Sequence, residues 1–296
     1  MGNRKMKFLI GFLFIAIIGI VYLGFNAKKF KDDGNTRSIT ISGSTALLPL
    51  MEVSVNNFNK THYGDIINVQ AGGSGTGLTQ VLDGTVNIGN SDMFANQKLT
   101  KEQSDELVDH KVVGEGFCIV ASKGCGITNL TTKQIREIFS GKIRNWKELG
   151  GNNEPILVIH RPASSGTRDT FTNTILGGNK DLENDGIGAV QDSNGAVLQA
   201  MKRSKGAISY MALTYMNNEE AKENLQIIKI DGMSPTIKNI EDGNYKFWSW
   251  GHMYTKGKAT GLAKEFIDYV MSKENAKEVE KLGFIPVHNI KVQPIL

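Results

Sequence analysis

The chain has 296 residues, 40% of them hydrophobic, which is enough for a globular protein with one large or two ordinary domains. Six of its 34 basic side chains precede the first acidic residue, Asp32, so the formal net charge of +4 becomes −2 beyond that N-terminal stretch (28 basic against 30 acidic side chains). A nucleic-acid-binding surface normally carries a basic stripe, and none is visible, so we expect no nucleic-acid partner.

The first predicted element is an apolar, uncharged run from Phe8 to Phe25, flanked by basic residues. It is about long enough to cross a bilayer as a helix. A cleaved secretory signal is the alternative, but neither a small-x-small cleavage site nor a lipoprotein cysteine follows. We expect residues 1–37 to be an uncleaved transmembrane helix and a polar tether, with the rest of the chain exported to the extracellular side of the cell membrane.

Beyond residue 37, short apolar strands alternate with amphipathic helices. This alternation predicts an α/β fold with parallel strands covered by helices, in which ligands bind at the carboxyl ends of the strands. A helix over 46–58 would place Leu47, Leu50, Met51, Val55 and Phe58 on one face, and Pro49 falls in its first turn, where proline is tolerated. We expect strands at 38–44, 65–70, 86–92 and 155–160, and further helices at 78–84, 165–176 and about 258–282.

Three turns that follow strands are rich in glycine, serine and threonine: 42–46, 72–77 and 161–167. The first and third lead straight into predicted helices, whose first N–H groups lack internal partners and attract anions. A serine cap beside a glycine turn is the commoner explanation of any one of them. Three together, with Arg161 just ahead of the third, favour a site for a small oxyanion. A similar turn at 192–202 is interpreted as structural.

Better-known motifs are missing from the sequence. It contains no P-loop and no nucleophile elbow, and Leu78 occupies the position of the last glycine of a dinucleotide-binding motif. The histidines are scattered singly, and Cys118 and Cys125 are too few and too close for zinc, so we expect no metal and no cofactor. The two cysteines could pair in an exported protein, but we favour a buried thiol and a loop cysteine.

Five segments, read in order from about Ser38 to about Val287, carry a family resemblance: SGSTALLPL, INVQAGGSGTGLTQVLDGTVNIGNSDM, HRPASSGTRDTF, KGAISYM and EKLGFIPV. They resemble the extracellular phosphate-binding proteins of bacterial phosphate ABC importers. The resemblance implies a type II periplasmic-binding-protein fold, in which two lobes, each a mixed sheet flanked by helices, close on one phosphate. We expect lobe 1 to comprise 38–113 and 248–296 and lobe 2 to comprise 114–247, with crossings within 115–124 and 245–257.

The resemblance also implies a phosphate shell made of hydroxyl groups, backbone N–H groups, one arginine and one aspartate. Arg161 would supply the charged contact. Arg168 is a second candidate cation: it lies in the first turn of a helix, where a cation is disfavoured, which indicates a nearby acid or ligand, and we leave it out of the expected ligand set. The expected ligands are Ser44, Thr45, Ala46, Ser74, Asp92, Arg161, Ser165, Gly166 and Thr167.

Asp92 is unexpected in an anion site, because a carboxylate repels an anion. Phosphate keeps at least one proton near neutral pH, however, and a carboxylate can accept that O–H in a charge-assisted hydrogen bond. Sulfate has no proton to donate, so in a closed site it would meet Asp92 as an unrelieved like charge. The alternatives are that Asp92 caps the following segment or pairs with Arg161 or Arg168.

These residues predict a non-catalytic, monomeric receptor that captures inorganic phosphate and passes it to phosphate ABC transporter permease subunits in the membrane. A phosphate sensor or surface protein on the same fold is the alternative. An extracellular phosphoryl-handling enzyme is a weaker one, because it needs a metal cluster or an activated nucleophile and the sequence offers neither.

Overall fold

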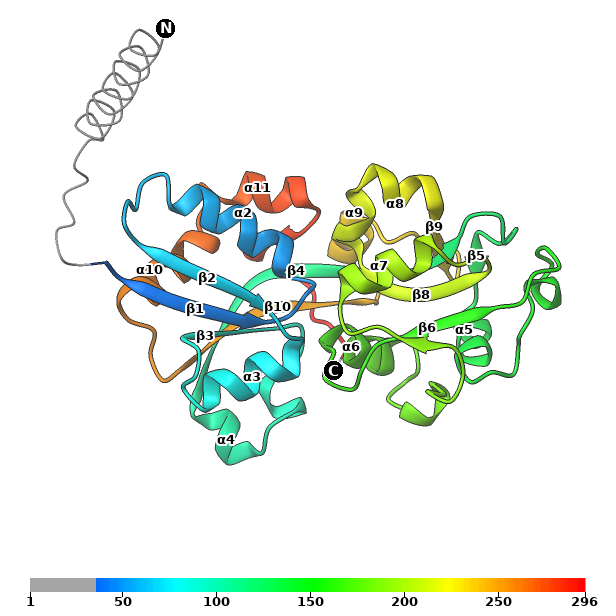
Figure 1. Cartoon of the computed structure of the whole chain (residues 1–296), viewed down its shortest axis with the longest axis horizontal. Helices are drawn as coiled ribbons and strands as arrows, with labels where there is room; N and C mark the ends of the chain where they lie inside the picture. Colours follow the sequence, from blue (N-terminus) through cyan, green and yellow to red (C-terminus); the bar gives the residue numbers. More distant parts are fainter. Residues whose placement is uncertain (1–35, 296) are drawn as a thin grey trace, which may run out of the picture. The chain divides into compact units, whose positions relative to one another are not determined.

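The computed structural model describes residues 36–295 (Figure 1). The expected membrane anchor lies outside these residues, as does most of the expected tether. Within 36–295, none of the helices combines the length and the apolar character that crossing a membrane requires.

The first sheet, with the helices around it, forms what we call lobe 1. Its strand order is β2-β1-β3-β10-β4, in which β1 pairs in parallel with β2 and β3 while β10 runs antiparallel to β3 and β4. The helices α2, α10 and α11 lie on one side of this sheet and α3 and α4 on the other (Figure 1). The elements are β1 (Ser38–Gly43), α2 (Leu48–Phe58), β2 (Ile66–Ala71), α3 (Ser74–Leu82), β3 (Ile88–Ser91), η1 (Ala95–Gln97), α4 (Lys101–Asp105), β4 (Leu107–Ser122), β10 (Trp248–Lys256), α10 (Gly261–Val270), α11 (Ala276–Leu282), β11 (Ile285–Pro286) and η5 (Val287–Asn289).

The second sheet, with its helices, forms lobe 2. It continues from β4 in the order β4-β8-β6-β7, with β9 paired to β4 and β5. β6 is parallel to β7 and β8, and β4 is antiparallel to β8 and β9. The elements are β5 (Asn129–Leu130), α5 (Thr132–Phe139), η2 (Trp146–Leu149), β6 (Leu157–His160), α6 (Gly166–Thr174), η3 (Lys180–Leu182), β7 (Ala189–Val190), α7 (Asn194–Lys202), β8 (Ala207–Ala212), η4 (Leu213–Asn217), α8 (Glu219–Asn224), β9 (Leu225–Ile230) and α9 (Ile237–Glu241).

Strand β4 connects the two lobes. It is 16 residues long; residues 107–116 pair with β10 of lobe 1, and residues 117–121 pair with β8 of lobe 2. The chain returns just before β10, where the backbone N–H of Phe117 donates to the Phe247 carbonyl at 3.0 Å and the Tyr245 hydroxyl donates to the Phe117 carbonyl at 2.9 Å. The expected two-lobed α/β architecture is confirmed.

Each lobe has its own apolar core. In lobe 1, α2 contributes Leu50, Met51 and Phe58, which are buried against the sheet and α10, as its periodicity predicts. Val55 on the same helix is only partly buried. A larger cluster, mainly in lobe 2, contains Trp146 and aromatic residues from β4, α5, α6, β8 and the segment 245–250, and it also includes Ala46 and Ile285 of lobe 1.

Two local predictions need correction. The helix expected at 78–84 begins earlier, at Ser74, so the second glycine turn also leads straight into a helix. Gly73 allows this entry with a φ of +84°, and a side chain at Gly77 would lie 2.7 Å from the carbonyl oxygens of Ser42 and Asn90, so close packing overrides the poor helix propensity of glycine. The region about 258–282 is two helices, α10 and α11, instead of one.

The cysteines are free and buried. Cys118 lies on β4, and Cys125 lies in the loop that follows. The favoured interpretation of a buried thiol and a loop cysteine is therefore confirmed, and the disulfide alternative is wrong.

Candidate functional site

The nine predicted ligand residues come from four segments of two lobes, and the structure brings them together in one buried place. All nine residues are buried. The lobes touch directly here, because the Gly75 N–H of lobe 1 donates to the Ser164 carbonyl of lobe 2 at 3.0 Å. The Thr167 hydroxyl also donates to Asp92 Oδ2 across the same boundary at 3.3 Å.

The first turn lies between β1 and α2. Ser44 Oγ accepts hydrogen bonds from the N–H groups of Ala46 at 3.0 Å and Leu47 at 3.3 Å. Thr45 Oγ1 accepts from the Asn194 side chain at 3.0 Å and from its backbone N–H at 3.2 Å, and Arg161 Nη2 lies 3.5 Å away. Ser44 therefore holds the backbone of this turn, and Thr45 Oγ1 joins the turn to Asn194 and Arg161 of lobe 2.

The second turn places Ser74 at the first position of α3. Its Oγ accepts from the Asp92 backbone N–H at 3.0 Å, and its own hydroxyl proton is free to point elsewhere. A Cβ at Gly166 would lie only 2.3 Å from this oxygen and 2.9 Å from Asp92 Cβ. Lobe 2 thus approaches Ser74 and Asp92 so closely that position 166 has no room for a side chain.

The third turn combines the arginine with a helix N-terminus. Arg161 is 1% exposed, and it donates through Nε to the Gln191 carbonyl at 3.1 Å and through Nη2 to the Asp192 carbonyl at 3.2 Å. Its Nη1 has no hydrogen-bond acceptor among residues 36–295. Burial lowers the pKa of Arg161, but a guanidinium stays charged at neutral pH. Ser165 caps α6 by accepting from the Arg168 N–H at 3.3 Å.

Asp92 follows β3 directly and faces the arginine turn. Burial raises the pKa of its carboxyl group, while a hydrogen bond from Ser44, the charge of Arg161 and a hydrogen bond from Thr167 act in the opposite direction. Asp92 Oδ1 receives no N–H or hydroxyl hydrogen bond from the described part of the chain. Among the nine predicted ligand residues, the site therefore offers an unpaired charged donor, Arg161 Nη1, and an unpaired carboxylate oxygen, Asp92 Oδ1.

The alternatives for Asp92 find no support in the geometry. Within residues 36–295, neither Arg161 nor Arg168 makes an ion pair with it. Arg168 instead pairs with Glu183 at 3.1 Å and Asp185 at 2.9 Å, which confirms the acid expected near this cation. Arg168 Nη1 also donates to the Arg161 carbonyl at 2.6 Å, so it helps to hold the arginine turn.

One group in the described chain has ligand atoms close enough to suggest a metal: His160, Glu183 and Asp185. Arg168 pairs with both carboxylates, and Glu183 Oε1 also contacts His160 Nδ1 and accepts from the Tyr210 hydroxyl, each at 2.8 Å. The guanidinium already supplies the positive charge that a metal ion would bring. This group is therefore an ion-pair network, and it fixes α6 through the side chain of Arg168.

Three further residues that were not predicted complete the site. Asn194, in the turn interpreted as structural, joins Thr45 to lobe 2 and accepts from the Ala212 N–H at 2.8 Å. The Tyr215 hydroxyl donates to the Thr45 carbonyl at 2.7 Å. Glu115 is fully buried on β4 beside Asp92. Only Glu115 gives a signal in the sequence, as a lone acid in an apolar run.

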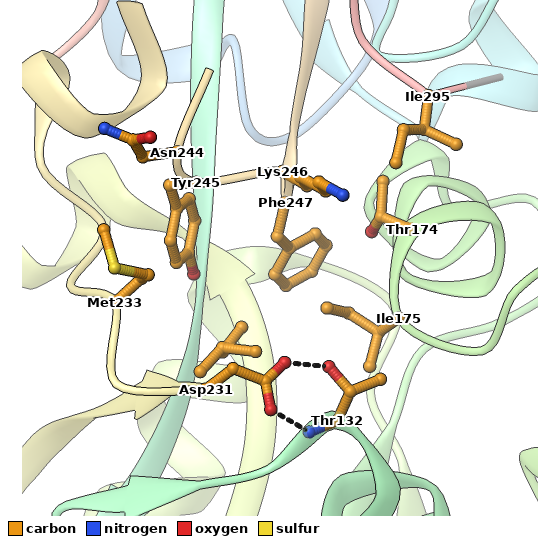
Figure 2. Close-up of a pocket in the computed structure, with 11 residues that line it drawn as sticks. Thr132, Thr174, Ile175, Asp231, Met233, Asn244, Tyr245, Lys246, Phe247 and Ile295 are labelled. Carbon is orange, nitrogen blue, oxygen red and sulfur yellow. Dashed lines mark hydrogen bonds between the residues drawn. The ribbon is translucent and has the colours of Figure 1, made fainter. Parts of the chain in front are cut away.

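A separate cavity of about 370 Å³ lies in lobe 2 (Figure 2). Asp231 borders this cavity, and its carboxylate already accepts hydrogen bonds from the start of α5: from Thr132 N at 3.0 Å and from Thr132 Oγ1 at 2.5 Å. Tyr245, Phe247 and other largely apolar side chains form much of the remaining wall. None of the nine predicted ligand residues lines this cavity, so it is distinct from the site between the lobes.

Comparisons with known proteins agree with this geometry. Residues 31–274 match the model of the PBP superfamily domain. The chain is 42% identical over 256 residues to the phosphate-binding protein PstS of Bacillus subtilis, covering 86% of this chain and 82% of that protein. It is 26% identical over 288 residues to PstS of Borreliella burgdorferi, covering 95% and 99%. Among solved structures, a phosphate ABC transporter substrate-binding protein from Clostridium perfringens with bound phosphate superimposes with a TM-score of 0.77 at 29% identity, covering 85% of this chain and all of that one.

Proposed function

Because the chain belongs to the phosphate-binding protein family within the PBP superfamily, we propose that it captures inorganic phosphate between its two lobes and delivers it to the permease of a phosphate ABC importer. One observation supports this most strongly. A buried guanidinium with a free N–H and a buried carboxylate with a free oxygen share a site that is otherwise made of hydroxyl groups and helix N-termini.

The chemistry of phosphate matches this pair. Its unprotonated oxygens accept hydrogen bonds from Arg161 Nη1, from the hydroxyl groups and from the N-terminal N–H groups of α6. Its O–H donates to Asp92 Oδ1. Sulfate lacks that proton and would place a negative oxygen against Asp92 in a dry site, which penalises it. The proposed ligand set is Ser44, Thr45, Ala46, Ser74, Asp92, Arg161, Ser165, Gly166 and Thr167.

The division of the chain follows from the same proposal. We assign residues 38–113 and 248–296 to lobe 1 and 114–247 to lobe 2, with β4 as one hinge strand. Residues 1–37 are proposed to anchor the protein in the cell membrane, with the lobes on the extracellular side, where phosphate is captured. We further propose that the receptor acts as a monomer and that it is not an enzyme, in line with relatives that are named for binding phosphate.

The ligand is tested by purifying the full chain without added anion, denaturing it and analysing the released anions by chromatography. Close to one phosphate for each protein molecule is expected. Release of a different anion in that proportion would contradict the proposal. Purification from phosphate-starved cells distinguishes a transport receptor from a phosphate sensor. Permease subunits should copurify with a transport receptor but not with a sensor.

A further inference from the structure

Glu115 is an acid without a counter-charge. It lies on β4 opposite Ser249 of β10, near the point where β4 passes from one sheet to the other. Its side chain is 0% exposed. Among residues 36–295, no N–H or hydroxyl group donates to either carboxyl oxygen, and no basic side chain forms an ion pair with it. An ionised carboxylate would be costly in such a place.

The Asp92 carboxyl group neighbours that of Glu115, close enough for a hydrogen bond between the two once one of them carries a proton. Two carboxyl groups that touch in a buried site cannot both be ionised, so they share a proton. Their surroundings decide which group keeps it. Burial raises the pKa of both groups. At Asp92 hydrogen bonds from Ser44 and Thr167 and the charge of Arg161 oppose this rise, whereas at Glu115 the charge of Asp92 adds to burial and the pKa lies well above its usual range.

We propose that Glu115 is a positioning residue of the phosphate site, which as a neutral acid donates a hydrogen bond to the Asp92 carboxylate and fixes the acceptor that receives the proton of the ligand. An ionised carboxylate has about four lone-pair positions. Thr167 takes one of them on Oδ2, and the O–H of Glu115 would take another, while Oδ1, which receives no N–H or hydroxyl group from the described residues, remains for phosphate. This inference rests on the proposed function, because it assigns a role within the same site.

Ionisation of Glu115 has a clear consequence. It would add a second negative charge beside Asp92 in a place that must also hold a phosphate anion. The other charged or titratable groups around this centre are Arg161 from lobe 2, Tyr215 of η4, Glu52 of α2 and His252 of β10. Only Arg161 is a fixed cation, so it cannot neutralise both carboxylates and the ligand.

The test compares Glu115→Gln, Glu115→Ala and the unchanged full chain. The amide introduced by Glu115→Gln can still donate to Asp92 but cannot ionise, whereas Glu115→Ala removes the donor. We measure the dissociation constant for inorganic phosphate by calorimetric titration from about pH 6 to pH 9. At pH 6 the dissociation constant of Glu115→Gln should lie within about threefold of that of the unchanged protein. Its relative affinity should rise with pH, because only the unchanged protein loses the proton of Glu115. Glu115→Ala should bind at least about tenfold more weakly at every pH.

Glu137→Gln, on α5, is the control, because it removes one carboxylate far from the proposed ligand set. It should show the pH profile of the unchanged protein. Parallel pH profiles for the unchanged protein and Glu115→Gln, or equal affinities of Glu115→Gln and Glu115→Ala, would overturn the proposal.

Infrared spectroscopy gives a readout that needs neither phosphate binding nor a folded variant. The unchanged protein, labelled with ¹³C-glutamate, should show a protonated glutamic acid C=O band at neutral pH that shifts with the label. Its absence would overturn the role of Glu115, even if phosphate binds. If phosphate fails to bind while the band is present, the proposed function is wrong, but the protonated state inferred for Glu115 is retained.

Discussion

Arg161 is the one fully charged donor of the proposed phosphate shell, and its guanidinium is held almost rigidly. Three of its contacts go to Thr45 and to the carbonyl groups of Gln191 and Asp192, which leaves Nη1 for the ligand. Because the orientation is set before the ligand arrives, little side-chain entropy is lost on binding.

We therefore predict that Arg161→Ala weakens phosphate binding by at least about 2 kcal/mol, or roughly 30-fold. Calorimetric titration measures the change. Arg203→Ala, which removes the same charge from an exposed position, should bind phosphate like the unchanged protein. Equal affinities for Arg161→Ala and Arg203→Ala would remove Arg161 from the site.

Asp92 determines selectivity more than affinity. Asparagine keeps an oxygen that can accept the phosphate O–H, but it lacks the negative charge that repels sulfate. Asp92→Asn should consequently lose more of the discrimination between phosphate and sulfate than of the affinity for phosphate. Titration of both anions checks this, with the exposed Asp83→Asn as the control. An unchanged phosphate-to-sulfate ratio in Asp92→Asn would argue against the role.

Most of the site could be predicted, because three of its segments are strand-to-helix turns with a recognisable composition, and the family resemblance indicated which of their residues, together with Asp92, would contact phosphate. The nine predicted residues do lie together, although their role as ligands stays a prediction. Asn194 could not be distinguished, since Ser-Asn-Gly before a helix is an ordinary cap and only the fold brings it to Thr45. Tyr215 lies in a 3₁₀ turn without any local pattern. Glu115 was detectable as a charge within an apolar strand, but its partner Asp92 was not.

At the scale of elements, the N-terminus of α6 is the part of lobe 2 that closes on lobe 1. It brings the backbone of Gly166 against Ser74 and Asp92, where a Cβ would meet Ser74 Oγ at 2.3 Å. The backbone of Gly166 does not need a left-handed conformation, so its lack of a side chain matters for space alone.

Gly166→Ala should thus weaken phosphate binding by about 1–3 kcal/mol, the usual cost of overpacking, because the lobes cannot approach fully. The melting temperature without phosphate should stay close to that of the unchanged protein, since the open lobes have room for the methyl group. Gly195→Ala is the matched control: it lies in the first turn of α7, where a Cβ meets nothing closer than 3.9 Å. If Gly166→Ala binds phosphate as Gly195→Ala does, the close approach at α6 plays no part in binding.

The elements themselves were largely predictable from hydrophobic periodicity, and the errors have local causes. The start of α3 was missed because the four glycines of 72–77 suggest a turn, whereas close packing against β1 and β3 accommodates Gly75 and Gly77 within a helix. Strand β4 was not among the strands we expected, because its first half is polar, and pairing with β10 stabilises it as a strand.

At the scale of the whole molecule, the arrangement of the lobes explains how hydrogen-bond donors that each contribute little can together bind phosphate tightly. Each turn contributes only a few dipoles, and each lobe carries only part of the set, with Asp92 on one and Arg161 on the other. Closing the lobes removes water and strengthens every contact at once. The sequence predicted this arrangement through the order of its motifs, but the contact between Gly75 and Ser164 follows only from the three-dimensional fold.

The most direct test of this account is calorimetric titration of the anion-free full chain with phosphate and with sulfate at neutral pH. The account predicts one phosphate bound for each protein molecule and an affinity for sulfate lower by at least about two orders of magnitude. Equal affinity for the two anions, or no heat from phosphate, would contradict the claim that a buried guanidinium and a buried carboxylate together select a protonated oxyanion.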